Sequence, residues 1–419
     1  MSIPLDRLYN HLDGLCNHDA IIYRFSPHGS KKLLDLNILR PQPWFEHMTK
    51  PLAFMHDQEP LNHHFYRPEV VEETISLWKY ADDLHNLAKG LHLRGASHRI
   101  LNACDYSLII HSEKNSTEVP KFEQNGFIGV YWWAHAAIAR DWFRYAEHDL
   151  DLSYNIDDFN YDFLAYNRAW SGTREYRLKF SELLLEKNLI ACCNTRFAAT
   201  DNDLHYTQHK FVNPELQIQN HSIEQSIPAN TTTACYSADY NNHDYKTAGI
   251  DVVLETLFDE TRHHLTEKVL RPIACGKPFI LAATLGSLQY LRDYGFKTFA
   301  PYINEHYDTV TDPLQRLQAI TDEMVRINRL PLEEKARLFE KLHSIAKYNK
   351  DLFFSDAWHQ QIFKEFETNF QTALKLAMQH RTGKYWKMLG MNIERIGPQY
   401  ASGPEEVQKF LDWFKQVNA

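Results

Sequence analysis

The stretch from Ile250 to Phe299 constrains the fold of this 419-residue chain more than any other. It opens with an apolar run, Ile250 to Leu254, that has the length and composition of a buried strand. After a polar loop, Thr266 has the side chain expected at a helix N-cap. Apolar residues then recur at helical spacing as far as Gly276, a residue type that commonly ends helices. The sequence therefore predicts a strand followed by a helix.

The same pattern repeats immediately downstream. Pro278 to Ala283 predicts a second buried strand, and Leu285 to Tyr294 predicts a second helix that ends at Gly295. Lys297 to Phe299 is expected to begin a third strand. Strands that alternate with helices through short connections form parallel sheets, because each helix carries the chain back across the sheet.

Ligands of such sheets bind at the carboxyl ends of the strands, close to the helix N-termini that follow. In this stretch that position holds Glu255, Thr266, Glu267 and Lys268. A helix start offers free N–H groups to a diphosphate, Lys268 adds positive charge, and Glu267 is placed to accept hydrogen bonds from ribose hydroxyls. The alternative is that Glu267 only complements the helix dipole and that Lys268 is solvated.

Five short motifs follow one another in and just beyond this stretch: Leu265-Thr-Glu-Lys-Val-Leu-Arg-Pro-Ile273, Gly276-Lys-Pro-Phe279, Leu288 to Leu291, Gly295-Phe-Lys-Thr-Phe299 and Glu305-His-Tyr-Asp308. In this order they resemble a family of glycosyltransferases that is common in tailed phages and some bacteria. The resemblance implies an α/β fold of two Rossmann-like domains, the GT-B architecture, with a C-terminal helix that crosses back to the first domain. It also implies a nucleotide-sugar donor bound to the C-terminal domain.

The chain is accordingly expected to have three parts. Residues 1–157 form an N-terminal acceptor-binding Rossmann-like domain, residues 158–378 a C-terminal nucleotide-sugar-binding Rossmann-like domain, and residues 379–419 a helical tail. Apolar runs predict six further strands: Asp19 to Phe25, Pro51 to His56, Tyr106 to Ser112, Gly126 to Val130, Asp162 to Tyr166 and Asn188 to Cys193. Helices are expected from Val70 to Lys89 and, at the end of the tail, from Gly403 to Val417.

The loop from Asn167 to Arg174 follows the first predicted strand of the second domain. Arg168 and Arg174 are placed there to bind a diphosphate through charge-assisted hydrogen bonds. The resembled family has an Asn-Arg-x-x-Arg-x-His-Arg pattern at this point. Asn167, Arg168 and Arg174 match that pattern, whereas Ser171 replaces an arginine and Thr173 replaces the histidine. The alternative is that both arginines are solvated surface residues.

An acidic segment, Asp57-Gln-Glu-Pro60, follows the predicted strand that ends at His56. Sugar transfer with inversion needs a carboxylate that accepts the proton of the acceptor hydroxyl, and Asp57 or Glu59 fits that catalytic role. The resembled family commonly has a similar Asp-Gln-Glu-Pro element. The alternative is a turn with an acidic N-cap for the next helix.

A helix rich in aromatic residues is predicted from Tyr131 to Tyr145. Aromatic rings interleaved with arginine can stack on bases and bind phosphates, so this helix is the candidate acceptor-binding element. Five of its residues would carry that role: Trp132, Trp133, His135, Arg140 and Arg144. The alternative is a plain interdomain helix with its tryptophans inside and its arginines outside.

Composition limits the possible functions. A hydrophobic content of 44% indicates a globular protein, and a formal net charge of −9 disfavours general non-specific DNA binding. The Asp-x-Asp pairs at 149–151 and 201–203 are interpreted as solvated, so no metal site is expected. No apolar run approaches the roughly 20 residues that span a bilayer, and no signal peptide is recognisable, so we expect a cytoplasmic protein without a membrane partner.

The resulting hypothesis is a glycosyltransferase that moves glucose or arabinose from a UDP-sugar to a hydroxyl acceptor, with no cofactor beyond the donor. The resemblance to phage members implies that the acceptor is 5-hydroxymethylcytosine in phage DNA, modified in the cytoplasm of the infected host. Three alternatives stay open: a transferase directed at a glycan or lipopolysaccharide, a non-catalytic protein that binds nucleotides or glycans, and a nucleotide-sugar epimerase of similar two-domain build.

Overall fold

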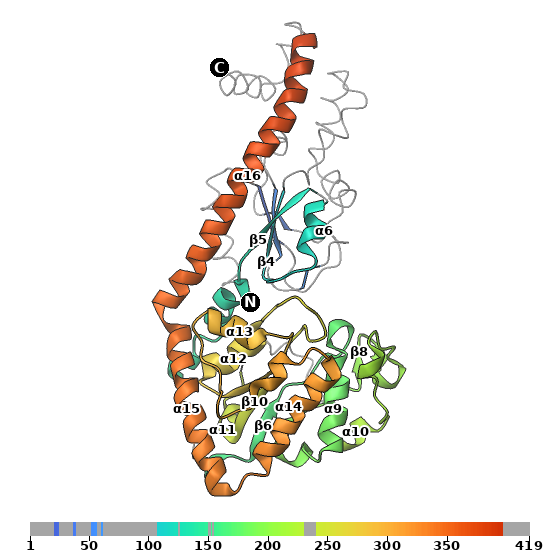
Figure 1. The fold of residues 1–419 in the computed structure, drawn as a ribbon, viewed down its shortest axis with the longest axis vertical. Coiled ribbons are helices and arrows are strands. Elements are labelled where there is room, and N and C mark those ends of the chain that lie inside the picture. The colour runs from blue at the N-terminus through green and yellow to red at the C-terminus, as the bar shows by residue number, and fades with distance from the viewer. Residues whose placement is uncertain are drawn as a thin grey trace. The chain divides into compact units, whose positions relative to one another are not determined.

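The computed structural model describes residues 21–24, 37–38, 52–56, 60–61, 107–124, 126–149, 152, 155–229 and 240–396 (Figure 1). The predicted base residues Asp57 and Glu59 and the predicted helices Val70 to Lys89 and Gly403 to Val417 lie outside these residues. The chain forms two compact units. The first comprises Met1–Ala134 and Phe363–Ala419, and the second His135–Ile362, whereas the sequence placed the joins at residues 157 and 378.

The first unit is built on a five-stranded sheet of order β2-β1-β3-β4-β5. Its strands and its described short helix are β1 (Ile21–Arg24), β2 (Asn37–Ile38), β3 (Leu52–His56), β4 (Ser107–His111), α6 (Val119–Gln124) and β5 (Phe127–Tyr131). All neighbours pair in parallel except the short β2, which pairs antiparallel with β1. The four predicted strands of this unit are confirmed, and β2 was not predicted.

The second unit is built on a four-stranded parallel sheet of order β11-β10-β6-β7 (Figure 1). Its strands are β6 (Tyr161–Ala165), β7 (Cys193–Thr195), β10 (Ala248–Leu254) and β11 (Phe279–Ala282). The chain runs from β6 outward to β7, then returns to β10 on the other side of β6. The strand order therefore reverses between β6 and β10, which makes their carboxyl ends a topological switch point.

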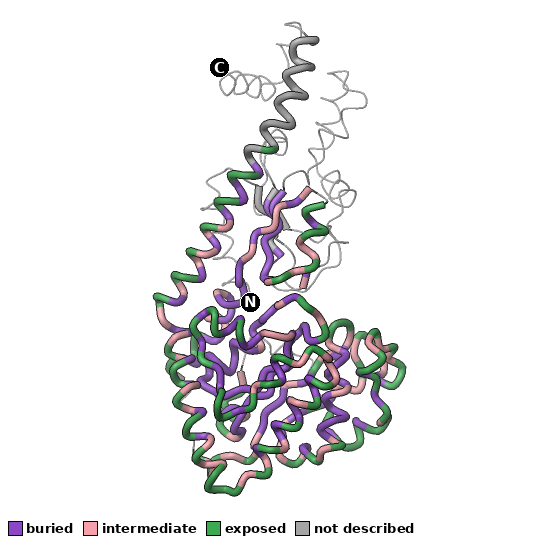
Figure 2. The backbone as a smooth tube through the Cα atoms, in the orientation of Figure 1, coloured by how far each residue is buried: buried purple, intermediate pink, exposed green. Residues whose placement is uncertain are grey.

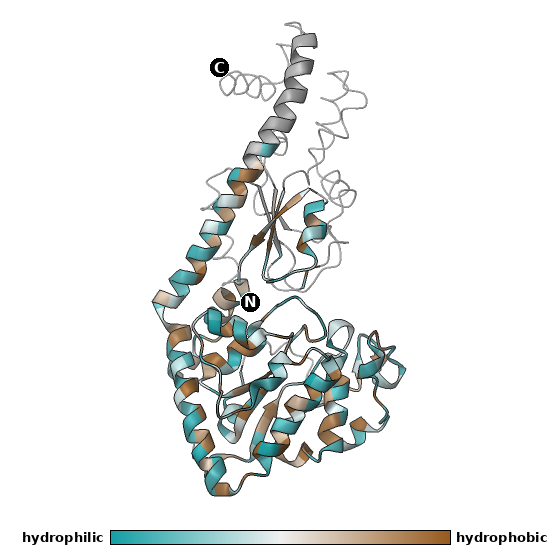
Figure 3. Cartoon of the chain, viewed as in Figure 1, coloured by the Kyte–Doolittle hydropathy of each residue, from teal (hydrophilic) through white to brown (hydrophobic). Residues whose placement is uncertain are grey.

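Helices complete the second unit. They are α7 (Ala134–Trp142), α8 (Ala146–Asp149), α9 (Tyr176–Glu186), α11 (Asn242–Thr247), α12 (Glu267–Cys275), α13 (Ser287–Asp293), α14 (Pro313–Asn328), α15 (Leu332–Phe354) and the beginning of α16 (Asp356–Ile396), whose residues from Phe363 onward group with the first unit. In Figure 2 strand β10 is continuously buried, whereas α14 and α15 alternate between buried and exposed residues. Figure 3 shows the matching mixture of hydrophobic and hydrophilic residues on both helices.

The element at the centre of the sequence analysis forms as predicted. All seven residues of β10 are buried, in agreement with its apolar run. Thr266 is the N-cap of α12, and its side chain accepts a hydrogen bond from the N–H of Lys268. Gly276 ends the helix at φ 70°, a left-handed conformation that glycine adopts without steric cost. The second strand and helix of the repeat are confirmed as β11 and α13.

Two predicted strands are corrected. Lys297 to Phe299 is not a strand, because its backbone donors bind side chains instead of a neighbouring strand. The N–H of Lys297 donates to Asn349 Oδ1, and that of Phe299 donates to Glu305 Oε1. The run predicted as a strand from Asn188 to Cys193 begins as a 3₁₀ turn, and only Cys193–Thr195 pairs in the sheet.

A small lobe, residues 196–229, follows β7. It contains β8 (Thr200–Asp201), β9 (Leu204–His205), the 3₁₀ turns η6 (Tyr206–Gln208) and η7 (Pro214–Leu216), and α10 (Ile223–Ser226). Its apolar core also includes two residues from outside the lobe, Trp170 and Leu178. The lobe is therefore packed onto the segment that follows β6.

No helix among the described residues is both long enough and apolar enough to cross a membrane.

Candidate functional site

The predicted donor-binding residues converge on the switch point of the second unit. Two segments leave the sheet there: residues 166–174 after β6, called the β6 loop, and residues 255–266 after β10, called the β10 loop. Arg168 and Arg174 belong to the first loop, and the remaining four belong to the second loop or to the first turn of α12: Glu255, Thr266, Glu267 and Lys268. Crevices at such switch points are the usual ligand sites of open parallel sheets.

Hydrogen bonds fix the segment that follows β6 against the end of β10. Thr173 Oγ1 donates to the carbonyl of Thr256 at 2.9 Å. The hydroxyl of Tyr176 donates to the carbonyl of Glu255 at 2.7 Å, and Arg177 Nη2 donates to the carbonyl of Leu254 at 2.6 Å. The position of the β6 loop beside β10 is thus set by main-chain acceptors at the end of the strand.

The two arginines of the β6 loop are accessible to different degrees. Arg168 is exposed, whereas Arg174 is half-buried at the end of the 3₁₀ turn η4 (Gly172–Arg174). Gly172 begins this turn at φ 65°, a conformation that side-chain-bearing residues rarely adopt. Arg174 ends this tight turn, and its charge acts on the carboxyl of Asp201.

Asp201 of the lobe holds the backbone of the β6 loop. Its Oδ2 accepts hydrogen bonds from the N–H groups of Trp170 at 2.9 Å and Ser171 at 2.7 Å. Burial raises the pKa of this carboxyl, but the hydrogen bonds from Ser171 and Trp170 and the charge of Arg174 lower the pKa overall. The interpretation of this Asp-x-Asp residue as a solvated acid is wrong, because Asp201 positions the loop.

Glu255 caps helix α12 from inside the protein. Its carboxylate is fully buried and accepts hydrogen bonds from the N–H groups of Thr266 at 3.0 Å and Val269 at 3.3 Å. It also accepts from the hydroxyl of Thr266 at 2.7 Å and from the N–H of Thr256 at 3.2 Å. A carboxylate of the protein thus occupies the anion position that a helix N-terminus offers.

The expectation that the N–H groups at this helix start are free is corrected for Thr266, Lys268 and Val269, each of which donates to a side chain of the protein. The N–H of Lys268 donates to Thr266 Oγ1 at 3.3 Å. Together with the bonds to Glu255, this contact engages the N–H groups of Thr266, Lys268 and Val269 within the chain. These N–H groups are therefore not available to a phosphate in this structure.

Glu267 remains ionised in a nearly closed environment. Its side chain is 8% exposed, Lys268 Nζ donates to its Oε1 at 2.9 Å, and His135 Nδ1 lies 3.7 Å from its Oε2. Burial raises the pKa of this carboxyl, but the charges of Lys268 and His135 and the hydrogen bonds outweigh burial and lower the pKa to about 2. His135, predicted as an acceptor-binding residue, is thus brought next to a predicted donor-binding residue.

Sequence reasoning missed the part of the β10 loop that lies beside His135. The buried ring of His264 is 5.2 Å from the ring of His135 in an edge-on arrangement, and the neighbouring His263 Nε2 lies 2.8 Å from the carbonyl of Leu285. The position of His263 and His264 in a loop that follows a buried strand is the sequence signal that could have placed them near the site.

Acid should remove the stabilisation that Glu267 provides. Because its pKa is lowered from 4.5 to about 2, its contribution is complete above pH 4.5 and is lost as the pH falls toward 2. At neutral pH, Glu267→Gln is expected to lower the free energy of unfolding by about 3 kcal/mol, and this difference should vanish near pH 2. Urea unfolding of both proteins across that range measures it. A difference in unfolding free energy that stays the same at every pH would contradict the conclusion that Glu267 is ionised at neutral pH.

The predicted acceptor-binding tryptophans are buried. Trp132 and Trp133 are both 0% exposed, and the indole of Trp132 stacks on Phe366 with ring centroids 4.4 Å apart. Arg140 donates to the carbonyl of Phe354 at 2.8 Å and to Asp356 Oδ1 at 2.7 Å. In this conformation neither indole can stack on a base, because base stacking requires an accessible ring face.

The remaining arginine of this set, Arg144, is about half exposed. It contacts Asp141 and the ring of Tyr145, which is itself exposed. The tryptophans are buried and the arginines lie at or near the surface. This arrangement agrees with the alternative in which the aromatic residues serve for packing. The predicted helix is also shorter than expected, since α7 ends at Trp142.

The first unit has a buried polar cluster at the carboxyl ends of β3 and β4. His56 and His111 are in-register partners on these strands, and burial together with the charge of His56 lowers the pKa of His111 to about 3. The buried carboxylate of Glu113 accepts from the N–H of Leu61 at 2.6 Å and from Ser116 Oγ at 2.5 Å. Glu113 therefore holds the described end of the segment that contains Asp57 and Glu59.

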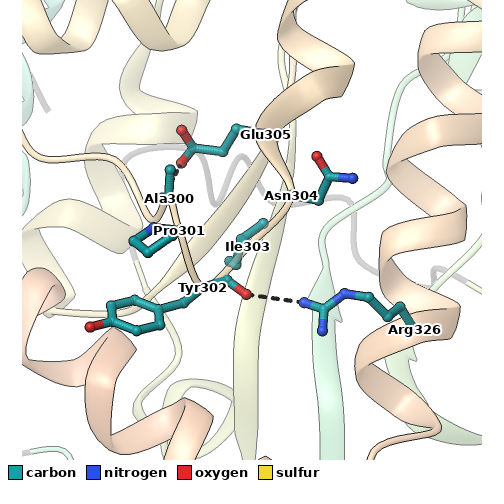
Figure 4. A pocket seen from close by; sticks show the side chains of 7 residues that line it. All are labelled: Ala300, Pro301, Tyr302, Ile303, Asn304, Glu305 and Arg326. Carbon is teal, nitrogen blue, oxygen red and sulfur yellow. Dashed lines mark hydrogen bonds between the residues drawn. The ribbon is translucent and has the colours of Figure 1, made fainter.

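A hollow of about 390 Å³ opens elsewhere on the second unit (Figure 4). Its lining residues are Ala300, Pro301, Tyr302, Ile303, Asn304, Glu305 and Arg326. Arg326 donates to the carbonyl of Tyr302 and pairs with Glu323, and the carboxylate of Glu305 accepts from backbone N–H groups. None of its lining residues comes from the β6 or β10 loop, and its charged groups are engaged with the protein.

Within the described part of the chain, no three His, Cys, Asp or Glu side chains gather in a way that could hold a metal ion. Comparison of the chain with known protein families, curated proteins and solved structures finds no match.

Proposed function

We propose that this protein is a glycosyltransferase of GT-B architecture that binds the diphosphate of a nucleotide-sugar at the switch point of its second unit. The observation that carries the proposal is the placement of three cationic side chains in segments that follow the carboxyl ends of β6 and β10: Arg168 and Arg174 on the β6 loop, and Lys268 in the first turn of α12. Cationic side chains at this place in a parallel sheet suit a nucleoside diphosphate. The order of the sequence motifs supports the same assignment.

The side chains, and not the helix, would neutralise the phosphates. In a transfer reaction the bond between the sugar and the diphosphate breaks, and negative charge develops on the leaving diphosphate. Arginine binds phosphate oxygens in pairs through its planar donors, so Arg168 and Arg174 suit this role. The side chain of Lys268 is 23% exposed, and its amine adds a third positive charge. Charge set in place before the reaction is commonly the largest catalytic contribution.

Glu267 would bind the ribose. A carboxylate with a pKa near 2 accepts hydrogen bonds from sugar hydroxyls at any physiological pH. Its contact with Lys268 links the ribose position to the phosphate position, and its contact with His135 limits the movement of the carboxylate. Glu255 and Thr266 would act indirectly, by holding the start of α12 in place.

The acceptor is assigned from the sequence. The resemblance favours 5-hydroxymethylcytosine in phage DNA, with Asp57 or Glu59 taking the proton of the attacking hydroxyl and glucose or arabinose as the transferred sugar. A base in a duplex would have to be flipped out to reach the sugar. Such a protein would work in the cytoplasm of the infected host.

One observation favours the alternative acceptor, a glycan or lipopolysaccharide. The rings expected to stack on bases, Trp132 and Trp133, are fully buried, and Arg140 is bound to the carbonyl of Phe354 and to Asp356. With a net charge of −9, little of the expected nucleic-acid surface is left. The donor site proposed above is the same for either acceptor.

The test is incubation of the full-length protein with UDP-glucose or UDP-arabinose and each acceptor class. Mass spectrometry of nucleosides from duplex DNA containing 5-hydroxymethylcytosine should show a hexose or pentose adduct. Unmodified cytosine DNA is the matched control. An adduct on oligosaccharide only would favour the glycan-directed alternative, and the absence of UDP release with every acceptor would contradict the transferase.

A further inference from the structure

We propose that Phe211 and Val212 form the surface against which the nucleobase of the donor packs. These residues belong to a strap, residues 209–213, in the lobe that follows β7. The inference depends on the proposed function, since it names the part of the donor site that contacts the base. Neither residue belongs to any of the motifs described above.

The strap is anchored to the β6 side of the switch point by a buried carboxylate. Glu175, at the start of α9, is 6% exposed. Its Oε2 accepts from the N–H of Val212 at 2.9 Å, and its Oε1 accepts from the N–H of Asn213 at 2.8 Å. His209 Nε2 lies 3.0 Å from the same carboxylate. Two backbone contacts and one side-chain contact thus join the strap to Glu175, the residue that follows Arg174.

The strap is also anchored to the β10 side. Asn213 Nδ2 donates to Asp259 Oδ2 in the β10 loop at 2.6 Å. The strap therefore bonds both to Glu175, which directly follows Arg174, and to the β10 loop, which leads into the first turn of α12 and Lys268.

The side chains of the strap are apolar and accessible. Val212 is 87% exposed, the highest value among the exposed large apolar residues of the described chain. Phe211 is half-buried and packs against the lobe core, with its ring 4.7 Å from the ring of His209. A single exposed valine is common on a protein surface and by itself indicates no binding site. Here its backbone is fixed by Glu175 at the rim of a candidate nucleotide site.

A nucleobase needs such a surface. Bases bind proteins largely through packing of their faces on aromatic and apolar side chains, and this packing tolerates different bases. The phosphates would be bound by cations, the ribose by Glu267, and the base by the strap. The strap therefore supplies the contact that distinguishes a nucleoside diphosphate from a bare pyrophosphate.

The experiment is calorimetric titration of the full-length protein with UDP and, separately, with inorganic pyrophosphate. Val212→Ser is expected to weaken UDP binding about 5-fold and to leave pyrophosphate binding unchanged, because it removes only packing against the base. Val212→Trp enlarges the surface and should tighten UDP binding. Leu332→Ser, at another exposed apolar residue of the same unit, is the matched control and should change neither affinity.

The outcomes separate this inference from the proposed function. UDP affinity that is unchanged in both Val212 variants, but reduced by Arg174→Ala, would overturn the strap assignment and leave the donor site intact. No UDP binding by the wild-type protein would overturn the proposed function and the strap with it. Equal loss of UDP and pyrophosphate binding in Val212→Ser would also overturn the inference, since the effect would not concern the base.

Discussion

Replacing Arg168 and Arg174 together by alanine should lower kcat/KM for sugar transfer about 1000-fold. Both residues lie on the β6 loop at the switch point, where the leaving diphosphate is proposed to gain negative charge. Removing one preset donor from such a site typically costs a factor of about 100 or more, and arginines that stabilise phosphate charge reach about 1000. Steady-state kinetics with a UDP-sugar measures the loss.

Two further variants show whether geometry or charge matters. Arg168→Lys and Arg174→Lys keep the charge but lose the planar pair of donors, so each should fall between wild type and alanine. Arg329→Ala removes an exposed arginine at the end of α14 and should leave kcat/KM unchanged. Wild-type kinetics in the double alanine variant would contradict the assigned phosphate site.

Replacing Glu255 by alanine should lower the free energy of unfolding by about 4 kcal/mol. The fully buried carboxylate accepts two N–H bonds from the start of α12, one hydroxyl bond from Thr266 and one N–H bond from Thr256. The variant leaves these donors buried without an acceptor, and each such loss costs about 1–3 kcal/mol. A smaller decrease is expected for Glu255→Gln, which keeps the shape and one oxygen. Urea unfolding monitored by circular dichroism gives the free energies.

The control for Glu255 is an exposed glutamate of the same unit. Glu340→Ala on α15 should change the free energy of unfolding by less than about 0.5 kcal/mol. Glu255→Ala as stable as this control would mean that the carboxylate does not cap α12. The first turn of the helix would then be open to a phosphate, as the sequence alone had suggested.

Local signals were enough to predict the repeat from β10 to α13. An apolar run, an N-cap threonine and a C-terminal glycine each act on their neighbours along the chain, so their consequences can be inferred without a structure. The parallel sheet follows from their alternation. The role of Glu255 could not be inferred this way, because a glutamate after a strand looks the same whether it faces a ligand or caps a helix 11 residues later.

The lobe and the predicted acceptor-binding helix also depend on contacts that cannot be predicted from the sequence, here between residues farther apart along the chain. Asp201 binds the N–H groups of residues about 30 positions earlier, and Glu175 binds the strap 37 positions later. Such pairings leave no periodicity in the sequence. For the aromatic helix predicted from Tyr131 to Tyr145, both alternatives require the same spacing, and only packing against distant segments decides between them.

The most direct test is a crystal structure of the full-length protein with UDP. The account predicts that the diphosphate lies within about 3 Å of donors on Arg168, Arg174 or Lys268, with Glu267 beside the ribose and the base over Val212. A diphosphate bound elsewhere on the second unit, for example in the hollow beside Tyr302 and Arg326, would contradict it.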